Sequence, residues 1–228
     1  MPRLFLSYRF RTHGRLIARG LIFLLPILGL LGCGHPPAMV YKYILEYTPP
    51  PAQGLPPLED SLKVQHFAVA QEFNTTAMVY RPTPYKSETY TYHRWRVNPG
   101  YLVTDYLLRD FRAAGLFKAV LPADSSSKSR FLLEGGVEEI QELDSPAGWQ
   151  AGLTLTVTLL DLQESEITKR VVYQKTFKTR EAMTDKTPQG LAEALSRAMQ
   201  RLSGEICLAV YQAARKVSTK EGLKPSAR

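Results

Sequence analysis

The segment AGLTLTVTLLD, residues 151–161, alternates aliphatic residues with threonine along most of its length. One face carries Leu153, Leu155, Val157 and Leu159, and the opposite face carries Thr154, Thr156 and Thr158. Because successive side chains of a strand point to opposite sides, this pattern predicts an antiparallel strand with one buried face. The polar residues 161–166 predict a turn, and residues 167–180 predict the hairpin partner. These two strands together predict a sheet with one face packed against a hydrophobic core.

Further strands are expected upstream of this hairpin. Short runs rich in β-branched and aromatic residues predict strands at 41–47, 62–69, 77–82, 88–97, 116–122 and 130–144. Gly135 and Gly136 interrupt the last of these and predict a bend or bulge there.

Two helices are expected, one between the strands at 88–97 and 116–122 and one after the last strand. Asn98-Pro99 predicts an N-cap with proline in the first turn, and Gly115 predicts the end of a helix that runs to Ala114. Thr187-Pro188 begins a longer helix, whose apolar stripe is Leu191, Leu195, Ala198, Leu202, Ile206 and Val210. The order of elements predicts an α+β fold, a mainly antiparallel sheet with two helices packed on one face and a Pro-rich tether before it.

The first 32 residues have the layout of a secretory signal. Five arginines precede an apolar run that is too short to span a bilayer, and Pro26 interrupts that run. The following Leu30-Leu31-Gly32-Cys33 resembles a bacterial lipobox, which implies cleavage before Cys33 and acylation of its thiol, for example with palmitate. By the same resemblance, Gly34 favours the outer membrane. The alternative is a signal anchor with Cys33 as an ordinary residue.

Composition divides the chain into four parts. Residues 1–32 are the expected signal, and 33–57 hold Cys33 and a tether with seven prolines around the early strand. Residues 58–214 are the expected α+β domain, and 215–228 a basic disordered tail that has five basic residues and one acid. Residues 33–214 carry 19 basic and 20 acidic residues, a balance that argues against nucleic acid as a partner.

The search for chemistry gives no catalytic motif. G-x-S-x-G, H-E-x-x-H, C-x-x-C and the P-loop pattern are all missing from the sequence. Cys207 falls on a helical apolar stripe, so we expect a small buried side chain rather than a reactive thiol. We therefore expect no enzyme, no metal and no cofactor.

Aromatic and basic residues gather between positions 80 and 96. Tyrosine, tryptophan and arginine are enriched where proteins bind one another, because they combine area with directional polar groups. In the expected strand, Tyr90, Tyr92 and Arg94 share one face, and His93 and Trp95 the other. The expected partner-binding residues are Tyr80, Arg81, Tyr85, Tyr90, Tyr92 and Arg94, with Tyr85 and Tyr90 exposed. Trp95 is expected to be structural, as part of the core.

Three stretches together resemble a known family. They are YKYILEYTPPP, VQHFAVAQEFNTTAMVYRPTPYKSETYTYHRWRVNP and LLRDFRAAGLFKAVL. In this order they resemble the ABC-type transport auxiliary lipoproteins, of which the paraquat-inducible protein C type is an example. The residues that match the family pattern are Val79, Tyr80, Arg81, Tyr92 and Trp95.

This resemblance implies a function for the chain. It implies an outer-membrane lipoprotein on the periplasmic face, held by lipidated Cys33, that docks or completes a lipid conduit with an MCE-domain protein. It also allows several copies to assemble into a ring. Two alternatives stay open: an envelope lipoprotein that itself binds lipid or assists assembly, and a periplasmic hydrolase with scattered catalytic residues.

Overall fold

The computed structural model describes residues 39–51, 54–146 and 148–222. The expected signal peptide and Cys33 lie outside these residues. Residues from Val40 onward form one compact unit, which is described by itself. Its strands are β1 Tyr41–Tyr43, β2 Leu58–Val64, β3 Ala68–Val69, β4 Ala77–Thr83, β5 Lys86–Trp95, β6 Phe117–Leu121, β7 Phe131–Ser145, β8 Gly148–Asp161 and β9 Val171–Ala182. Its helices are α2 Pro99–Ala114 and α3 Pro188–Gly222, with short 3-10 turns η1 Gln71–Phe73 and η2 Ile167–Lys169.

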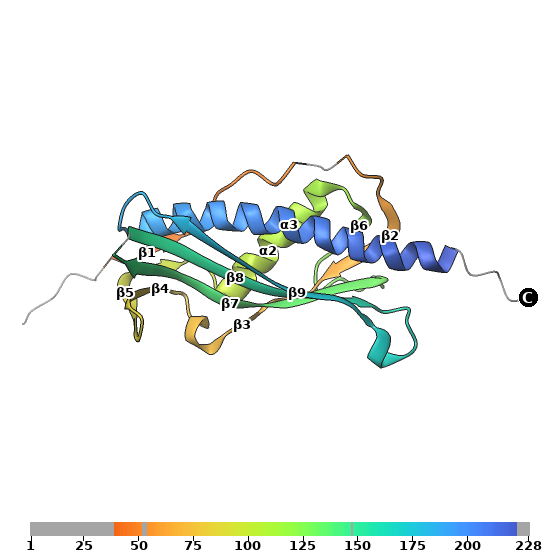
Figure 1. The fold of residues 1–228 in the computed structure, drawn as a ribbon, viewed down its shortest axis with the longest axis horizontal. Coiled ribbons are helices and arrows are strands. Elements are labelled where there is room, and N and C mark those ends of the chain that lie inside the picture. The colour runs from red at the N-terminus through yellow and green to blue at the C-terminus, as the bar shows by residue number, and fades with distance from the viewer. Residues whose placement is uncertain (1–38, 52–53, 147, 223–228) are drawn as a thin grey trace, which may run out of the picture. The chain divides into compact units, whose positions relative to one another are not determined.

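The centre of the sheet is β7, which is bordered along both of its edges (Figure 1). On one edge β8 runs antiparallel to it, and β9 runs antiparallel to β8, as the alternation in 151–161 predicted. On the other edge β2, β3 and β4 lie in succession, all parallel to β7. Outside these, β6 pairs with β2, and β5 and then β1 extend from β4.

The sheet is mixed, so the prediction of a mainly antiparallel sheet is wrong. Five strand pairs are parallel, namely β1–β5, β2–β6, β2–β7, β3–β7 and β4–β7. Alternation within one strand reports which face is buried, but not the direction of its neighbours. The pairs that sequence reasoning missed join segments far apart in the chain.

The strand expected at 62–69 is two strands, because the chain breaks at Phe67. The Phe67 ring is buried against Gly135, where an added Cβ would lie 2.7 Å from a ring carbon. The Phe67 N–H donates to Thr104 Oγ1 of α2 at 3.0 Å instead of to a strand. The register of β7 is irregular at Glu138 rather than at Gly135 and Gly136, where a bulge was expected. Gly135 therefore makes room for Phe67.

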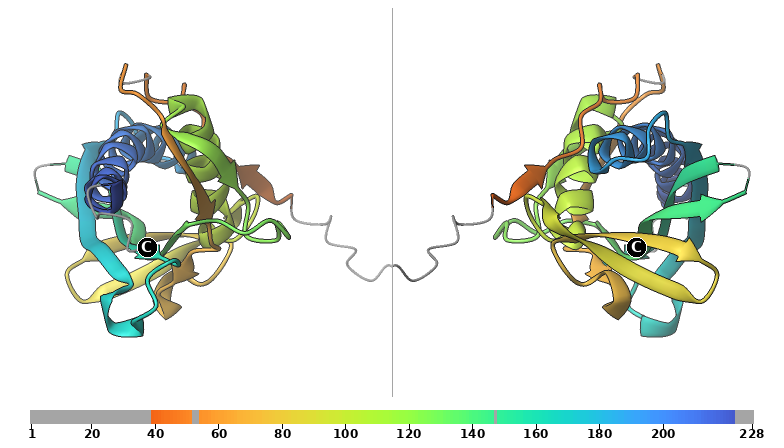
Figure 2. Two further views of the ribbon diagram at one scale, coloured as in Figure 1. Left: turned by 90° about the vertical axis from the view of Figure 1, so that its right-hand side faces the viewer. Right: turned by 90° about the vertical axis from the view of Figure 1, so that its left-hand side faces the viewer.

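Both helices pack on the same side of the curled sheet, as predicted (Figure 2). Asn98 accepts from the Gly100 N–H at 2.9 Å and caps α2, and Gly115 ends that helix with φ +63°. The core between the layers includes Phe111, Phe131, Leu155 and Leu195, all without exposed surface. The described residues contain no helix that is long and apolar enough to cross a membrane.

The described part of the Pro-rich stretch packs on the helices. The early strand ends at Tyr43, and the residues that follow, 44–51 and 54–57, are named the strap here. Leu45 of the strap is buried, and its carbonyl accepts from the Tyr106 hydroxyl of α2. The Pro56 carbonyl accepts from the Tyr211 hydroxyl of α3 at 2.7 Å. The strap residues therefore pack on α2 and α3 and do not form a free tether.

The last helix is longer than expected. α3 continues to Gly222, so the basic tail expected from residue 215 begins inside the helix. Ser218 still contacts the sheet, because its hydroxyl donates to Asp60 at 2.7 Å.

Candidate partner-binding surface

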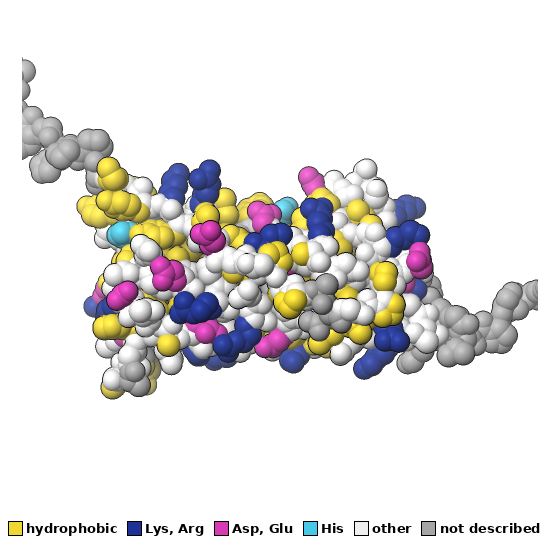
Figure 3. All heavy atoms as spheres, turned by 90° about the horizontal axis from the view of Figure 1, so that it is seen from above, with side chains coloured by type: hydrophobic (Ala, Val, Ile, Leu, Met, Phe, Trp, Pro, Cys, Tyr) yellow, Lys and Arg dark blue, Asp and Glu magenta, His cyan; other side chains and the backbone are white. Residues whose placement is uncertain are grey.

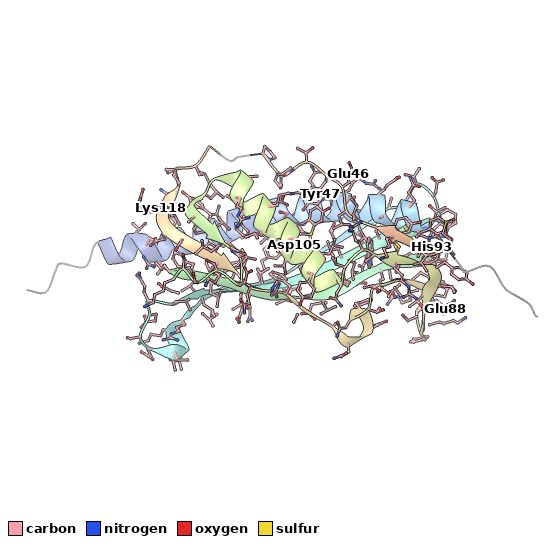
Figure 4. The ribbon with its side chains drawn as sticks, turned by 180° about the vertical axis from the view of Figure 1, so that it is seen from behind. Glu46, Tyr47, Glu88, His93, Asp105 and Lys118 are labelled. Carbon is pink, nitrogen blue, oxygen red and sulfur yellow. The ribbon has the colours of Figure 1, made fainter. Side chains whose placement is uncertain are left out.

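Aromatic rings line one end of the unit, where β1, β4 and β5 meet. The aromatic cluster is defined as Tyr41, Tyr43, Tyr80, Tyr90 and His93. His93 stacks on Tyr41 at 5.2 Å between ring centroids, and its Nδ1 lies 2.9 Å from the Tyr43 hydroxyl. Tyr90 touches His93 edge-on at 5.9 Å and lies 4.7 Å from Tyr80. Figure 4 shows His93 and Glu88 at this end and Lys118 at the other.

A bulge in β5 creates this cluster. Ala77 pairs with Arg94, and Val79 pairs with Thr89. Between these two pairs β4 advances by two residues, whereas β5 advances by five. A bulge adds residues to one strand and changes the side to which the following side chains point. Tyr90 and His93 were expected on opposite faces, but the bulge brings their rings into contact. The periodic pattern in the sequence carries no signal for such a shift.

An acid pair, the buried Glu142 and the partly buried Asp144 of β7, lies beneath the cluster. The Tyr90 hydroxyl donates to Glu142 Oε2 at 2.7 Å, and Lys186 donates to Asp144 Oδ2. Glu142 has no exposed surface. Burial, together with the neighbouring Asp144 carboxyl, raises the pKa of Glu142, and burial raises the pKa of Tyr90. Tyr90 is therefore half-buried and fixed, rather than exposed as expected.

A second carboxylate holds Tyr80. The Tyr80 hydroxyl donates to Glu88, and Lys86 forms an ion pair with the same carboxylate. These two donors lower the pKa of Glu88, whereas its hydrogen bond raises the pKa of Tyr80. The rings of Tyr80 and Tyr90 are thus each oriented by an acid.

The remaining predicted partner-binding residues differ in exposure. Tyr85 lies fully exposed between β4 and β5, and Tyr92 is 48 % exposed. Arg81 and Arg94 are half-buried. Trp95 is 2 % exposed and belongs to the core. The structure therefore brings Tyr80 and Tyr90 together as a supporting layer and leaves Tyr85 and Tyr92 as free aromatic surface.

Trp149 was not anticipated from the sequence. It opens β8 opposite Asp144, is 40 % exposed, and has the Lys186 ammonium 5.9 Å from its ring centroid. The sequence feature that could have indicated it is a tryptophan that follows Gly148, just before the alternating segment 151–161. The turn between β7 and β8, next to Trp149, lies at the same end of the unit as the turn between β4 and β5 (Figure 1).

An open groove of about 660 Å³ lies between the start of the strap and α3. It is lined by Lys42, Tyr43, Ile44, Glu46, Tyr47, Thr48, Gln189, Ala192, Glu193, Ser196, Arg197 and Gln200. This mixed polar lining suits a protein or peptide surface better than an apolar ligand. Within the described residues, no group of three or more His, Cys, Asp or Glu side chains is placed to hold a metal ion.

A family model described as ABC-type transport auxiliary lipoprotein component matches residues 43–207. A crystal structure of a Xanthomonas campestris protein, described as DUF330, has a TM-score of 0.70 at 20% identity, covering 80% of this chain and 99% of that one. A second solved structure, of an uncharacterized protein, gives a TM-score of 0.58 at 12% identity, covering 76% and 99%. No curated protein matches the chain.

Proposed function

The chain belongs to the family of ABC-type transport auxiliary lipoprotein components, and from this membership we propose that it is a non-catalytic docking component of an MCE-type lipid transport system. In this proposal it sits on the periplasmic face of the outer membrane and joins an MCE-domain protein to that membrane. The lipid passes between the inner and outer membranes. This chain holds the MCE-domain protein in place and catalyses no reaction.

The proposed anchor is the lipidated Cys33. One acyl chain gives only marginal, reversible membrane binding, whereas two or three chains hold a protein at a bilayer without a spanning helix. Supporting this are the arginine-rich start, the short apolar run and the lipobox-like residues 30–33. Cys207 is not an alternative anchor, because it is buried and burial raises the pKa of its thiol to about 12.

The observation that carries the docking role is the exposed aromatic surface of the β4–β5 end. Tyr85 is fully exposed and Tyr92 half-exposed, while the acids Glu88 and Glu142 hold the rings of Tyr80 and Tyr90 behind them. Rigid aromatic side chains lose little entropy when a partner covers them. Arg81 and Arg94 add cations that suit carboxylates or backbone carbonyls of the partner.

The test is capture of the MCE-domain protein by the full lipoprotein in a Gram-negative host. A photo-crosslinking residue at position 85 or 92 should yield a covalent adduct with that partner, and one at Ile167 of η2, which is 75% exposed, should not. Tyr85→Ala, Tyr92→Ala and Arg94→Ala should each weaken capture without lowering the melting temperature. Undiminished capture by all three variants would refute the assigned surface.

Trp95→Ala separates docking from folding in the same assay. Its ring is buried, so truncation should lower the free energy of unfolding by about 3–5 kcal/mol. Capture by this variant should then fall together with the melting temperature, unlike capture by Tyr85→Ala.

A further inference from the structure

The start of the described fold exposes aliphatic and aromatic surface. Val40 is 45 % exposed, Tyr41 51 % and Ile44 52 %. The view from above shows hydrophobic side chains gathered beside a histidine at the end where the described chain begins (Figure 3). Tyr41 is the edge of the aromatic cluster, and its stacking on His93 fixes the direction of its ring. We name Val40, Tyr41 and Ile44 the β1 surface.

Two cations border the β1 surface. Lys42 and Arg96 are both exposed, and the Arg96 N–H donates to the Tyr43 carbonyl at 2.8 Å, which holds it next to β1. Neither forms an ion pair within the described residues. An aliphatic pair, a tyrosine and free cations form the combination that favours the boundary between lipid headgroups and acyl chains.

The length of chain between Cys33 and β1 limits where this surface lies. Tyr41 follows Cys33 by eight residues, so even a fully extended segment spans no more than about 30 Å. A protein acylated at Cys33 therefore keeps β1 within about one bilayer thickness of the headgroups. The β8–β9 turn with η2 lies at the opposite end of the unit and is not constrained in this way (Figure 1).

We propose that the β1 surface lies on the phospholipid headgroup layer, with Val40, Tyr41 and Ile44 in the interface and Lys42 and Arg96 against lipid phosphates. This inference rests on the proposed acylation of Cys33. It goes beyond docking because it gives the domain a fixed orientation: β1 faces lipid, and the neighbouring Tyr85 and Tyr92 stay free for the protein partner. The headgroup layer thus acts as a second contact besides the acyl chains.

The test uses an environment-sensitive thiol dye. Acylation occupies Cys33 and burial shields Cys207, so a cysteine introduced at Ile44 is the reactive site. The lipidated Ile44→Cys protein, labelled with NBD, is placed in vesicles of phosphatidylethanolamine and phosphatidylglycerol. We expect a severalfold rise and a blue shift of NBD emission relative to detergent-free buffer without lipid, and quenching by nitroxide-labelled lipid. Val40→Cys is a second position that should behave alike.

Ile167→Cys is the matched control, because it is an exposed isoleucine at the far end. Its NBD emission should stay unchanged on vesicles. Equal emission and equal quenching at positions 44 and 167, on chains whose intact mass shows the acyl groups, would overturn the lipid contact alone and leave the docking role standing. An intact mass without acyl groups would overturn both the anchor and this inference.

Discussion

Glu142 is a carboxylate without exposed surface, and only one of its oxygens has a hydrogen-bond donor among the described residues. That donor is the Tyr90 hydroxyl. The second oxygen lies on the side of Asp144, whose Oδ1 also has no donor there. Burial is the main cause of the raised pKa of Glu142, and the neighbouring Asp144 carboxyl raises it further, because two adjacent carboxyl groups do not both ionise easily. The acid pair therefore orients a tyrosine at a cost in stability.

This cost should appear as a pH dependence. The pKa of Glu142 is higher in the folded protein than in the unfolded chain, so its contribution to stability is present below the unfolded pKa and is lost as pH rises through the folded pKa. Glu142→Gln removes that loss and supplies an N–H to Asp144. The variant should therefore gain stability over wild type as pH rises from about 4 to about 8, measured by urea unfolding.

Glu88→Gln is the control with the opposite sign. Lys86 and Tyr80 lower the pKa of Glu88, so its contribution is present above the unfolded pKa and is lost as pH falls. This variant should lose stability relative to wild type as pH rises. A stability difference that is independent of pH for Glu142→Gln would show that the acid pair is not the cause.

Among the elements, the packing of Phe67, which lies between β2 and β3, against β7 depends on a glycine. An added Cβ at Gly135 would lie 2.2 Å from the Thr156 carbonyl oxygen as well as against the Phe67 ring. At Gly136 the nearest atom, at 2.9 Å, belongs to the flexible Glu138 side chain. The two neighbouring glycines therefore differ in what a methyl group would displace.

Gly135→Ala should thus be the more harmful of two matched changes. Overpacking against backbone and a buried ring typically costs about 1–3 kcal/mol. Gly136→Ala should cost less, because Glu138 can move aside. Chemical denaturation of both variants measures the difference, and equal losses would contradict the role given to the Phe67 contact.

The same elements show how far sequence patterns reach. The alternation in 151–161 predicted β8 with its buried face, and Asn98 and Gly115 predicted both ends of α2. Alternation carries no signal for a bulge, so the contact of Tyr90 with His93 was missed. It also carries no signal for parallel pairing of β2 and β4 with β7, because these partners lie 60 to 70 residues apart and no local turn joins them. The sequence therefore predicted individual strands and helix ends, but not which strands pair in parallel or which aromatic rings come into contact.

For the whole molecule, a polar contact ties the strap to both helices. The Tyr47 hydroxyl of the strap donates to Asp110 Oδ2 of α2 at 2.7 Å, and the Ser203 hydroxyl of α3 donates to the same oxygen at 2.6 Å. Arg109 lies 4.3 Å from the centre of the Tyr47 ring and pairs with Asp110. Figure 4 shows Tyr47 beside the helices. Segments separated by more than 150 residues therefore share one buried carboxylate.

Tyr47→Phe should loosen this connection while keeping the ring. Loss of a hydrogen bond to a charged group costs about 1.5–3 kcal/mol of unfolding free energy. The control Tyr85→Phe removes the hydroxyl of a fully exposed ring and should change stability by less than about 0.5 kcal/mol. Hydrogen exchange of the strap amides should rise in Tyr47→Phe, and unchanged protection together with unchanged stability would contradict the role given to the contact between Tyr47 and Asp110.

The shared edge of β7 also bears on how the chain is made. Leu62 pairs with Phe131 and Tyr80 with Glu142, so the N-terminal strands find their neighbours only after roughly 60 to 70 further residues have been synthesised. Contacts this distant form slowly, because a long loop must close before they stabilise anything. The pairings of β2 and β4 with β7 therefore cannot form before β7 has been synthesised. The core is still incomplete at that point, because β8, β9 and α3 follow β7 in the chain and supply buried residues such as Leu155 and Leu195.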